Sequence, residues 1–409
     1  MKNALLILDH FPPSFAPRMG YLSKYLKDTG WDAYAISMPH PVSKTGFESL
    51  AHFIESEEIK ETRWFGNHKI NRLAIELYGL TRLRRLWSYN DELMYRTAKE
   101  ILKKRQFDAV LCSTASFFPL LCASRIAEEY GLPLLTDLRD IYEQNDNFLT
   151  HRNLSTFLRK MQIKRRNRIL KKSAAVSTVS PWHRNLLSEI NPDTRLIYNG
   201  FDPDLFRYTQ PEKTEKFTIT YTGTVPAYEH DSTRSPELLF KAIAELYRSG
   251  HFAEDSVRVR FYTNSPSREF VNAYVEKYGL GDIADIHGWV DSEKIPQILS
   301  ESNILLILSS ELLTHGILTT KVFEYMAANR EILCIPNSGG DLQELINRAN
   351  AGCCTDSYPE LRNYLKFKYD EWKKTGIVKS HSDPDFVSAF SRERQAIQFA
   401  GILYEISGK

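Results

Sequence analysis

Cysteine is scarce in this 409-residue sequence, and the five cysteines form no C-x-x-C pair. Their odd number and scattered positions argue against a disulfide framework and against a zinc site. They are Cys112, Cys122, Cys334, Cys353 and Cys354. Unpaired cysteines are typical of a reducing compartment, so we expect a cytoplasmic protein.

Long apolar runs are also missing. The N-terminal run ALLIL ends at Asp9 and is too short for the core of a signal peptide. No other run approaches the ~18 apolar residues that a membrane-spanning helix needs. We therefore expect a soluble chain whose only contact with a membrane would be peripheral, at the inner face.

Neither sign of charge is in large excess, since 53 Lys and Arg residues and 51 Asp and Glu residues leave a net charge of +2. This balance gives no reason to expect nucleic acid as the partner. The sequence contains no G-x-G-x-x-G and no Walker loop, which counts against a dehydrogenase and against a P-loop NTPase.

Metal-binding patterns are equally scarce. Asp202 with Asp204, and Asp383 with Asp385, have the Asp-x-Asp spacing that some sugar-transferring enzymes use to hold a divalent ion. Each pair encloses a proline and precedes a predicted helix start, so we expect caps and turns instead. The sequence thus predicts neither a metal nor a cofactor.

Short apolar runs alternate with longer amphipathic segments along the chain, as in βαβ units with parallel sheets. In the first half this pattern predicts strands over 4–9, 32–37, 107–113, 132–137, 174–180 and 194–199, and helices over 17–30, 90–105 and 117–130. In the second half it predicts strands over 217–223, 257–263, 283–288, 304–309 and 330–336, and helices over 235–250, 267–280, 293–302, 319–330 and 341–350.

The polar stretch 208–216 separates these two series. We expect an α/β protein of two doubly wound domains, 1–205 and 206–385, with residues 386–409 as a helix that packs back on the first domain. In such sheets ligands bind at the carboxyl ends of the strands, so candidate site residues should follow strands directly.

One such segment surrounds Lys321. Thr319 or Thr320 begins a predicted helix after a strand and a loop, where free N–H groups and the helix dipole attract phosphate. Lys321 in the first turn adds positive charge near a diphosphate. Glu324, one turn further on, can accept two hydroxyl hydrogen bonds from a ribose. The alternative is a solvated Lys321 and a Glu324 that only compensates the helix dipole.

A second segment, 136–146, places Asp137, Arg139 and Asp140 at the end of a predicted buried strand. Asp140 or Asp137 could orient an acceptor hydroxyl or take its proton. The alternative is a structural Asp–Arg pair that fixes the loop.

The order of several segments resembles family 4 of the GT-B glycosyltransferases. FPPSFAPRMGYLSKYLKDTGWDAYAIS (11–37) is similar to the first βαβ unit of that family. Four further segments are similar to the end of its first domain, the opening of its second domain, a strand-end loop and its donor-binding block. They are TVSPWHRNLL with RLIYNGFDPDLF, TITYTGTV, IHGWV, and LTTKVFEYMAANREILCIPNSGGDLQELINRANAGCC.

This resemblance implies a GT-B fold, in which two Rossmann-like domains face a cleft. The first domain would bind the acceptor and the second a nucleotide-sugar donor. The reaction would transfer a sugar from a nucleotide-diphosphate-sugar to a carbohydrate or lipid-linked acceptor, in the synthesis of a cell-surface polysaccharide or another glycan. Members of the family retain the anomeric configuration and need no metal.

The resemblance also implies a set of donor-binding residues. Arg18 would reach the donor phosphate from the first domain, and Arg234 would bind it from the second. The full set is Arg18, Gly223, Arg234, His287, Gly316, Ile317, Leu318, Thr319, Thr320, Lys321 and Glu324. The family commonly carries a second Glu eight residues before the ribose-binding one, where this sequence has Gly316. Backbone groups of residues 316–318 would then take over part of the sugar recognition.

The near-neutral total hides a division of charge. Residues 1–205 contain 30 basic and 23 acidic residues (net +7), and the remainder contains 23 and 28 (net −5). Residues 150–172 hold nine Lys and Arg residues and no acid, and residues 81–87 add three Arg and a Trp. A basic helix with interleaved aromatics can lie on an anionic membrane surface; a solvated face packed by long side-chain stems is the alternative.

Two other functions remain open. A GT-B sugar-nucleotide epimerase would bind the same donor but needs paired acid and base carboxylates. A non-catalytic GT-B partner subunit is the second, because Gly316 replaces the usual Glu.

Overall fold

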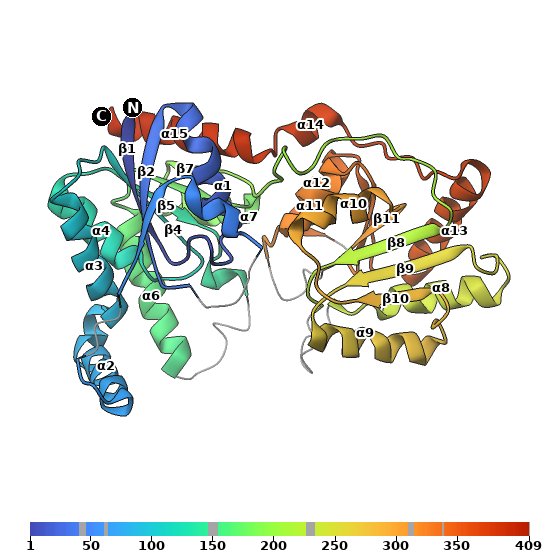
Figure 1. Cartoon of the computed structure of the whole chain (residues 1–409), viewed down its shortest axis with the longest axis horizontal. Coiled ribbons are helices and arrows are strands. Elements are labelled where there is room, and N and C mark those ends of the chain that lie inside the picture. The colour runs from blue at the N-terminus through green and yellow to red at the C-terminus, as the bar shows by residue number, and fades with distance from the viewer. Residues whose placement is uncertain are drawn as a thin grey trace. The chain divides into compact units, whose positions relative to one another are not determined.

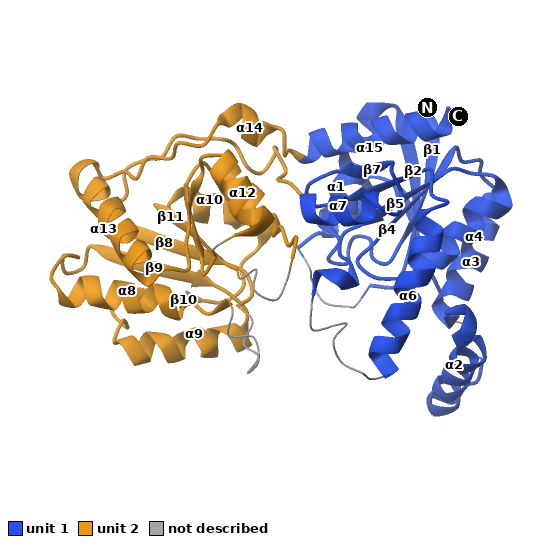
Figure 2. Ribbon diagram, turned by 180° about the vertical axis from the view of Figure 1, so that it is seen from behind, with its two compact units in different colours: residues 1–198, 392–409 blue, residues 199–391 orange. Residues whose placement is uncertain are grey.

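The computed structural model describes residues 1–40, 46–60, 64–145, 154–225, 234–309, 315–337 and 339–408. The chain divides into two compact units, one of residues 1–198 with 392–409 and one of residues 199–391 (Figure 2). Each unit is built on its own parallel β-sheet.

Unit 1 contains a seven-stranded sheet with the strand order β3-β2-β1-β4-β5-β6-β7. The strands are β1 (Lys2–Leu8), β2 (Trp31–Ser37), β3 (Glu55–Glu58), β4 (Ala109–Thr114), β5 (Leu134–Leu138), β6 (Ala175–Thr178) and β7 (Thr194–Leu196). Every residue of β4, β5 and β6 is buried, as expected for parallel strands covered on both faces. All the paired strands run parallel, so their carboxyl ends share one edge of the sheet.

Helices cover both faces of this sheet (Figure 1). They are α1 (Pro17–Leu26), α2 (His68–Arg82), α3 (Tyr89–Leu102), α4 (Leu120–Tyr130), α6 (Leu154–Leu170), α7 (Pro181–Ser188) and α15 (Arg392–Ser407), with the short helical turns η1 (Lys27–Thr29), η2 (Glu48–His52), η3 (Leu83–Arg85) and η4 (Tyr142–Gln144). Alternate residues of β1 face opposite layers. Leu6 joins the cluster formed by α1 and α15, whereas Leu5 joins the one formed by α3 and α4.

The C-terminal helix α15 belongs to unit 1, although it is far in sequence from the α1 and β1 residues that it packs against. Phe399 and Leu403 are buried in the cluster that α1 and β1 also form. The Tyr404 ring packs edge-on against Trp31 at 5.3 Å, and its hydroxyl donates to the Thr29 carbonyl at 3.2 Å. Full burial of each large apolar side chain stabilises by about 1.5–3 kcal/mol, which holds the chain end in place.

The first boundary between the units lies at residue 198, earlier than the predicted boundary at 205. Phe201 already pairs with the segment that ends unit 2: its N–H donates to the Phe390 carbonyl at 3.2 Å, and it forms a parallel bridge with Ser391. This contact between residues distant in sequence assigns residues 199–205 to unit 2.

Unit 2 contains a six-stranded sheet with the order β10-β9-β8-β11-β12-β13. Its strands are β8 (Phe217–Thr222), β9 (Val257–Tyr262), β10 (Ala284–His287), β11 (Ile304–Leu308), β12 (Glu331–Ile335) and β13 (Gly352–Cys354). Its helices are α8 (Glu237–Arg248), α9 (Ser265–Tyr278), α10 (Ile295–Ser300), α11 (Thr320–Ala327), α12 (Gly340–Arg348), α13 (Tyr358–Thr375) and α14 (Pro384–Ser388), with the turn η6 (Ser292–Lys294).

Among the strands and α-helices of the described residues, five are absent from the sequence-based prediction: β3, α2, α7, β13 and α13. β3 is the charged edge strand ESEE, and no side chain of α2 is fully buried, so neither carries the usual core-facing pattern. Pro236 stands at the N-cap position of α8, and the hydroxyl of the preceding Ser235 accepts from the Glu237 N–H at 3.1 Å. Within the described ranges, no helix has the length and apolarity needed to cross a membrane.

Candidate active site

A cavity of about 260 Å³ opens in unit 2 at the carboxyl ends of β8 and β11. The loop before α11 and the first turn of that helix form much of its wall. The lining residues are Tyr221, Thr224, Arg234, Ile307, Leu308, Ser309, Ile317, Leu318, Thr319, Thr320 and Lys321. Six of the predicted donor-binding residues are therefore brought together: Arg234, Ile317, Leu318, Thr319, Thr320 and Lys321.

Gly223 makes room for the Lys321 side chain. Its φ is +118°, in the region that favours glycine, and a Cβ added there would lie 2.5 Å from Lys321 Cε and 2.6 Å from Nζ. The ammonium lies 5.6 Å from the centre of the Tyr221 ring. A side chain at residue 223 would displace the ammonium, so the close approach requires glycine.

The electrostatics of the cavity favour an anion. Burial lowers the pKa of Lys321, and nearby Arg234 lowers it further, while Glu324 on the same helix acts in the opposite direction. The free protein thus holds two cations near each other at a partly desolvated position. A bound anion would relieve this cost, because an opposite charge stabilises the protonated ammonium.

The start of α11 adds a second attraction for negative charge. The helix begins at Thr320, and the Thr319 side chain makes no capping hydrogen bond, which leaves the first N–H groups available. The macrodipole carries a partial positive charge at this end. The helix start, Lys321 and Arg234 together place positive charge around the cavity, an arrangement that suits an anion.

The backbone conformation at residue 316 favours glycine. Its φ of +67° lies in the left-handed region, where a residue with a side chain pays roughly 1–2 kcal/mol. A Glu at this position would be strained in the observed loop. The backbone conformation therefore differs from one that would suit a glutamate.

Two buried tyrosines, Tyr221 and Tyr325, make hydrogen bonds beside the cavity. The Tyr221 hydroxyl donates to the Thr224 carbonyl at 2.7 Å. The Tyr325 hydroxyl accepts from the Thr222 N–H at 3.3 Å and lies 3.0 Å from the Thr222 hydroxyl. These contacts join α11 to the end of β8 and so fix Lys321 relative to Gly223.

Two further predicted donor residues of unit 2, Glu324 on α11 and His287, are not among the cavity-lining residues. His287 ends the edge strand β10, is exposed, and stacks on Tyr262 with ring centres 4.7 Å apart. Because β9 separates β10 from β8, His287 is not among the cavity-lining residues.

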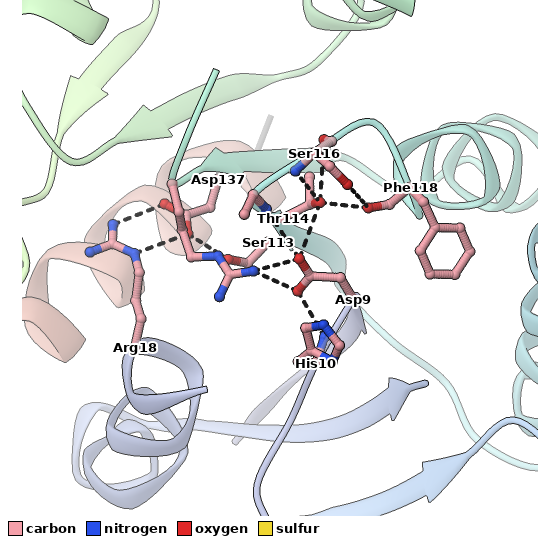
Figure 3. Close-up of polar contacts among 10 residues, drawn as sticks. Asp9, His10, Arg18, Ser113, Thr114, Ser116, Phe118 and Asp137 are labelled. Atoms are coloured by element: carbon pink, nitrogen blue, oxygen red, sulfur yellow. Dashed lines mark hydrogen bonds and ion pairs between the residues drawn. The ribbon is translucent and has the colours of Figure 1, made fainter. Parts of the chain in front are cut away.

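In unit 1 the strand ends hold a buried ion pair (Figure 3). Arg18 Nε donates to Asp137 Oδ2 at 3.0 Å and Nη2 donates to Oδ1 at 2.9 Å. The Ser113 and Ser177 hydroxyls donate to the same carboxylate at 2.7 and 2.8 Å. Arg18 also donates to the carbonyls of Tyr198 and Ile197 at 3.0 and 2.9 Å.

Two predicted site residues, Arg18 and Asp137, are therefore partners of each other. Arg18 is 3% exposed and donates to groups inside unit 1. Asp137 is fully buried; burial alone would raise its pKa, but Arg18 and the two serines outweigh burial and lower it. A carboxylate that accepts four hydrogen bonds and has a lowered pKa is a poor proton acceptor, and its ion-pair partner is Arg18 and not an Arg of the same segment.

Arg139 is likewise tied to another carboxylate. Its Nη2 donates to both oxygens of Asp9, which also accepts from the Ala115 N–H at 3.1 Å and the His10 N–H at 2.7 Å. The pair joins the ends of β1, β4 and β5. Arg139 therefore positions the loop after β5. Its partner Asp9, the last residue of the first predicted strand, was not singled out by the sequence-based prediction.

Asp140 is the one predicted catalytic residue that faces solvent. Its Oδ1 accepts from Gln144 Nε2 at 3.1 Å, and the residue lines a small pocket with Ser116, Tyr142 and Gln162. Of the three strand-end charges, Asp140 has the exposure that contact with a substrate requires.

No group of three or more His, Cys, Asp or Glu side chains among the described residues is arranged to hold a metal ion. The Asp383 side chain accepts from the N–H groups of Asp385 and Phe386 and caps α14, as predicted. Asp202 likewise accepts from the Asp204 N–H at 3.2 Å. All five cysteines are free thiols.

Because His183 on α7 is buried, we expect the stability of the protein to depend on pH. It is 1% exposed, and the described residues offer no hydrogen-bond partner to either ring nitrogen. Burial lowers its pKa from 6.5 to about 4, with Glu143 opposing and Arg166 adding to the shift. Between these pH values the unfolded chain binds the extra proton, so stability should fall by about 3 kcal/mol as pH decreases through the window.

Urea unfolding above and below this pH window measures the effect. His183→Phe should remove the part of the slope that His183 contributes, and the exposed His10→Phe serves as the matched control that keeps it. An unchanged slope in His183→Phe would contradict the assignment.

Comparison with known proteins agrees with this architecture. Residues 20–205 match the family model described as Glycosyltransferase Family 4. A search of curated proteins finds no match to the chain.

Solved structures match over almost the full length. HepE from Anabaena in complex with UDP is 15% identical with a TM-score of 0.67, covering 99% of this chain and 100% of that one. Sucrose-phosphate synthase from Thermosynechococcus elongatus is 14% identical with a TM-score of 0.67, covering 99% and 98%. The lipopolysaccharide outer core galactosyltransferase WaaB is 12% identical with a TM-score of 0.62, covering 98% and 99%.

These structural matches confirm the predicted GT-B fold. The family match over residues 20–205 agrees with the resemblance stated from the sequence: this part of the chain is similar to glycosyltransferase family 4.

Proposed function

We propose that this GT-B-fold protein is a glycosyltransferase, which binds a nucleotide-diphosphate-sugar in the cavity of unit 2 and transfers its sugar to a carbohydrate or lipid-linked acceptor. The observation that carries the proposal is the approach of Lys321 to Gly223 beside Arg234 at the start of α11. Two cations and a helix N-terminus in one cavity suit a diphosphate.

Each group has a role in the proposed reaction. Lys321 and Arg234 bind the diphosphate, whose negative charge grows as the bond to the sugar breaks. Fixed cations at that position lower the barrier because their attraction to the diphosphate is stronger in the transition state than in the ground state. Glu324, three residues after Lys321 on α11, accepts hydroxyl hydrogen bonds from the ribose.

The sugar itself would contact the loop before α11. Gly316 keeps its left-handed backbone, and the peptide groups of residues 316–318 replace the carboxylate that the family commonly uses there. Retention at the anomeric carbon and independence of metal are part of the proposal, since they follow from the family and not from a measured reaction.

The acceptor side of the proposal rests on Asp140 in unit 1. Its carboxylate would orient the acceptor hydroxyl or accept its proton, while Arg139 and Asp9 hold the loop. Asp140→Asn should lower kcat roughly a hundredfold, near the low end for proton transfer because the residue is exposed. A matched control is Asp282→Asn, an exposed carboxylate of unit 2 outside the cavity; equal rates in both variants would contradict the role.

UDP-glucose is the first donor to test, because HepE has been crystallised with UDP and with UDP-glucose. The expected acceptor class is a glycan intermediate, in line with the lipopolysaccharide core galactosyltransferase among the structural matches. The proposed setting is synthesis of a cell-surface polysaccharide or another glycan.

The experiment is a thermal-shift panel of nucleotide sugars, followed by product analysis with the donor that binds. A true donor raises the melting temperature by mass action, by an amount set by its concentration relative to Kd. Consumption of the donor without an acceptor would indicate an epimerase. Binding of no nucleotide sugar would overturn the proposal and favour a non-catalytic partner subunit.

A further inference from the structure

Helix α2 of unit 1 presents an unusual exposed apolar face. Ile70, Leu73, Leu77 and Leu80 are 51%, 56%, 53% and 67% exposed. Their spacing places them along one side of the helix, within about a quarter of its circumference at 3.6 residues per turn. We call these four residues the α2 stripe.

The opposite side of α2 is anchored. Ile75 and Tyr78 pack on the cluster that α3 and α4 form, and the Tyr78 ring contacts Tyr89 edge-on at 5.9 Å. The Asn67 side chain caps the helix start by accepting from the Lys69 N–H at 2.9 Å. The helix is therefore held by one face while the stripe lies on the other, at the periphery of unit 1 (Figure 1).

A strongly cationic groove of about 1210 Å³ adjoins the end of α2. It runs between the segment 81–87, α4 and α6. Its charged lining consists of eight cations, Arg82, Arg84, Arg85, Arg125, Arg165, Arg168, Lys171 and Lys172, and two acids, Glu92 and Glu128. Lys172 pairs with Glu128 at 2.9 Å, and the net charge of the groove remains strongly positive.

We propose that the α2 stripe and the cationic groove dock unit 1 on an anionic lipid bilayer. The stripe would enter the boundary between headgroups and acyl chains, and the groove cations would bind lipid phosphates. A charged surface alone would suit any polyanion. An exposed leucine-rich helix face beside it gains free energy only where apolar surface leaves water, which selects a bilayer over a soluble polyanionic glycan.

This surface differs from the one predicted from the sequence, which comprised 81–87 and 150–172 and left α2 out. Residues 150–153 lie outside the described part of the chain. Arg166 of α6 is buried and bonded to Glu143, so it takes no part. The inference goes beyond the proposed sugar transfer and does not depend on it.

Co-sedimentation of the full-length protein with vesicles tests the proposal. Wild type should bind vesicles of equimolar phosphatidylcholine and phosphatidylglycerol, bind phosphatidylcholine vesicles weakly, and dissociate as salt rises. Each cation near an anionic surface contributes about fivefold in affinity, so Arg84→Gln with Arg85→Gln should weaken binding roughly 25-fold. Leu73→Gln with Leu77→Gln should weaken it roughly tenfold or more.

Matched controls come from α13 of unit 2. Phe367→Gln replaces a side chain that is 66% exposed, and Lys373→Gln with Lys374→Gln removes two exposed cations. Both should bind vesicles like wild type, and nucleotide-sugar thermal shifts should be unchanged in all four variants, which separates this test from that of the proposed function.

Equal binding of wild type and the α2 variant to anionic vesicles would overturn the proposal. So would tight binding of a heparin-like polyanion with none to vesicles. A change from dimer to monomer in the α2 variant with unchanged vesicle binding would instead assign the stripe to self-association.

Discussion

Lys321→Met should lower kcat/KM for the nucleotide sugar roughly a thousandfold, which corresponds to about 4 kcal/mol of transition-state stabilisation. Methionine keeps most of the apolar stem beside Tyr221 and Gly223 but removes the charge that a leaving diphosphate needs. Initial rates over a range of donor concentrations measure the effect. Loss in kcat as well as in donor affinity would show that the ammonium acts in the transition state.

Lys366→Met is the matched control, because Lys366 is an exposed cation of the same unit outside the cavity. It should leave both constants unchanged. Donor affinity of wild type should also weaken at a lower alkaline pH than for an ordinary lysine, since the pKa of Lys321 is lowered and phosphate binds the protonated form. Activity of Lys321→Met within tenfold of wild type would contradict the donor site.

Arg18→Met should destabilise the protein by about 3–5 kcal/mol without a direct effect on donor binding. The substitution leaves the carboxylate of Asp137 fully buried with two serine donors and no opposite charge. Urea unfolding at neutral pH measures the loss.

The pH dependence follows from the lowered pKa of Asp137. In wild type the stability from the ionised pair is present above the unfolded-state pKa and is lost as pH falls through the folded-state value. In Arg18→Met the buried carboxyl becomes easier to protonate, so the deficit relative to wild type should shrink in acid.

Two variants separate the pair from ordinary packing. Arg18→Met with Asp137→Leu should recover much of the stability, because no uncompensated charge remains. Arg72→Met, which removes an exposed Arg paired with Glu76, should cause little change. A similar loss in Arg72→Met and Arg18→Met would refute the special status of the buried pair.

Helix α11 and the loop that precedes it could be predicted because the sequence signals for them are local. A buried strand, a loop and a helix start follow one another in the sequence, and the position of Lys321 in the first turn follows from the helix start. Short apolar runs and helical patterns likewise predicted most strands and helices, since core-facing side chains must be apolar. Helix α2 was not predicted in this way because the four apolar residues of the α2 stripe face solvent.

The burial and the ion-pair partners of the three strand-end charges could not be predicted from the local sequence. Asp137, Arg139 and Asp140 lie within four positions, yet one is buried, one is tied to Asp9 and one is exposed. Arg18 and Asp137 are 119 residues apart and meet because β1, β4 and β5 lie side by side in the sheet. Strand order is a property of the whole chain, so it decides which charge finds a partner.

By itself, the sequence determined the fold class, the order of the elements and the segment around Lys321, because periodicity, capping and charge act over a few residues. Only the tertiary structure decided that Lys321 occupies the space beside Gly223, that Arg18 pairs with Asp137, and that the α2 stripe faces no core. Each of these depends on contacts between distant residues, where desolvation makes a charge costly unless a partner arrives with it.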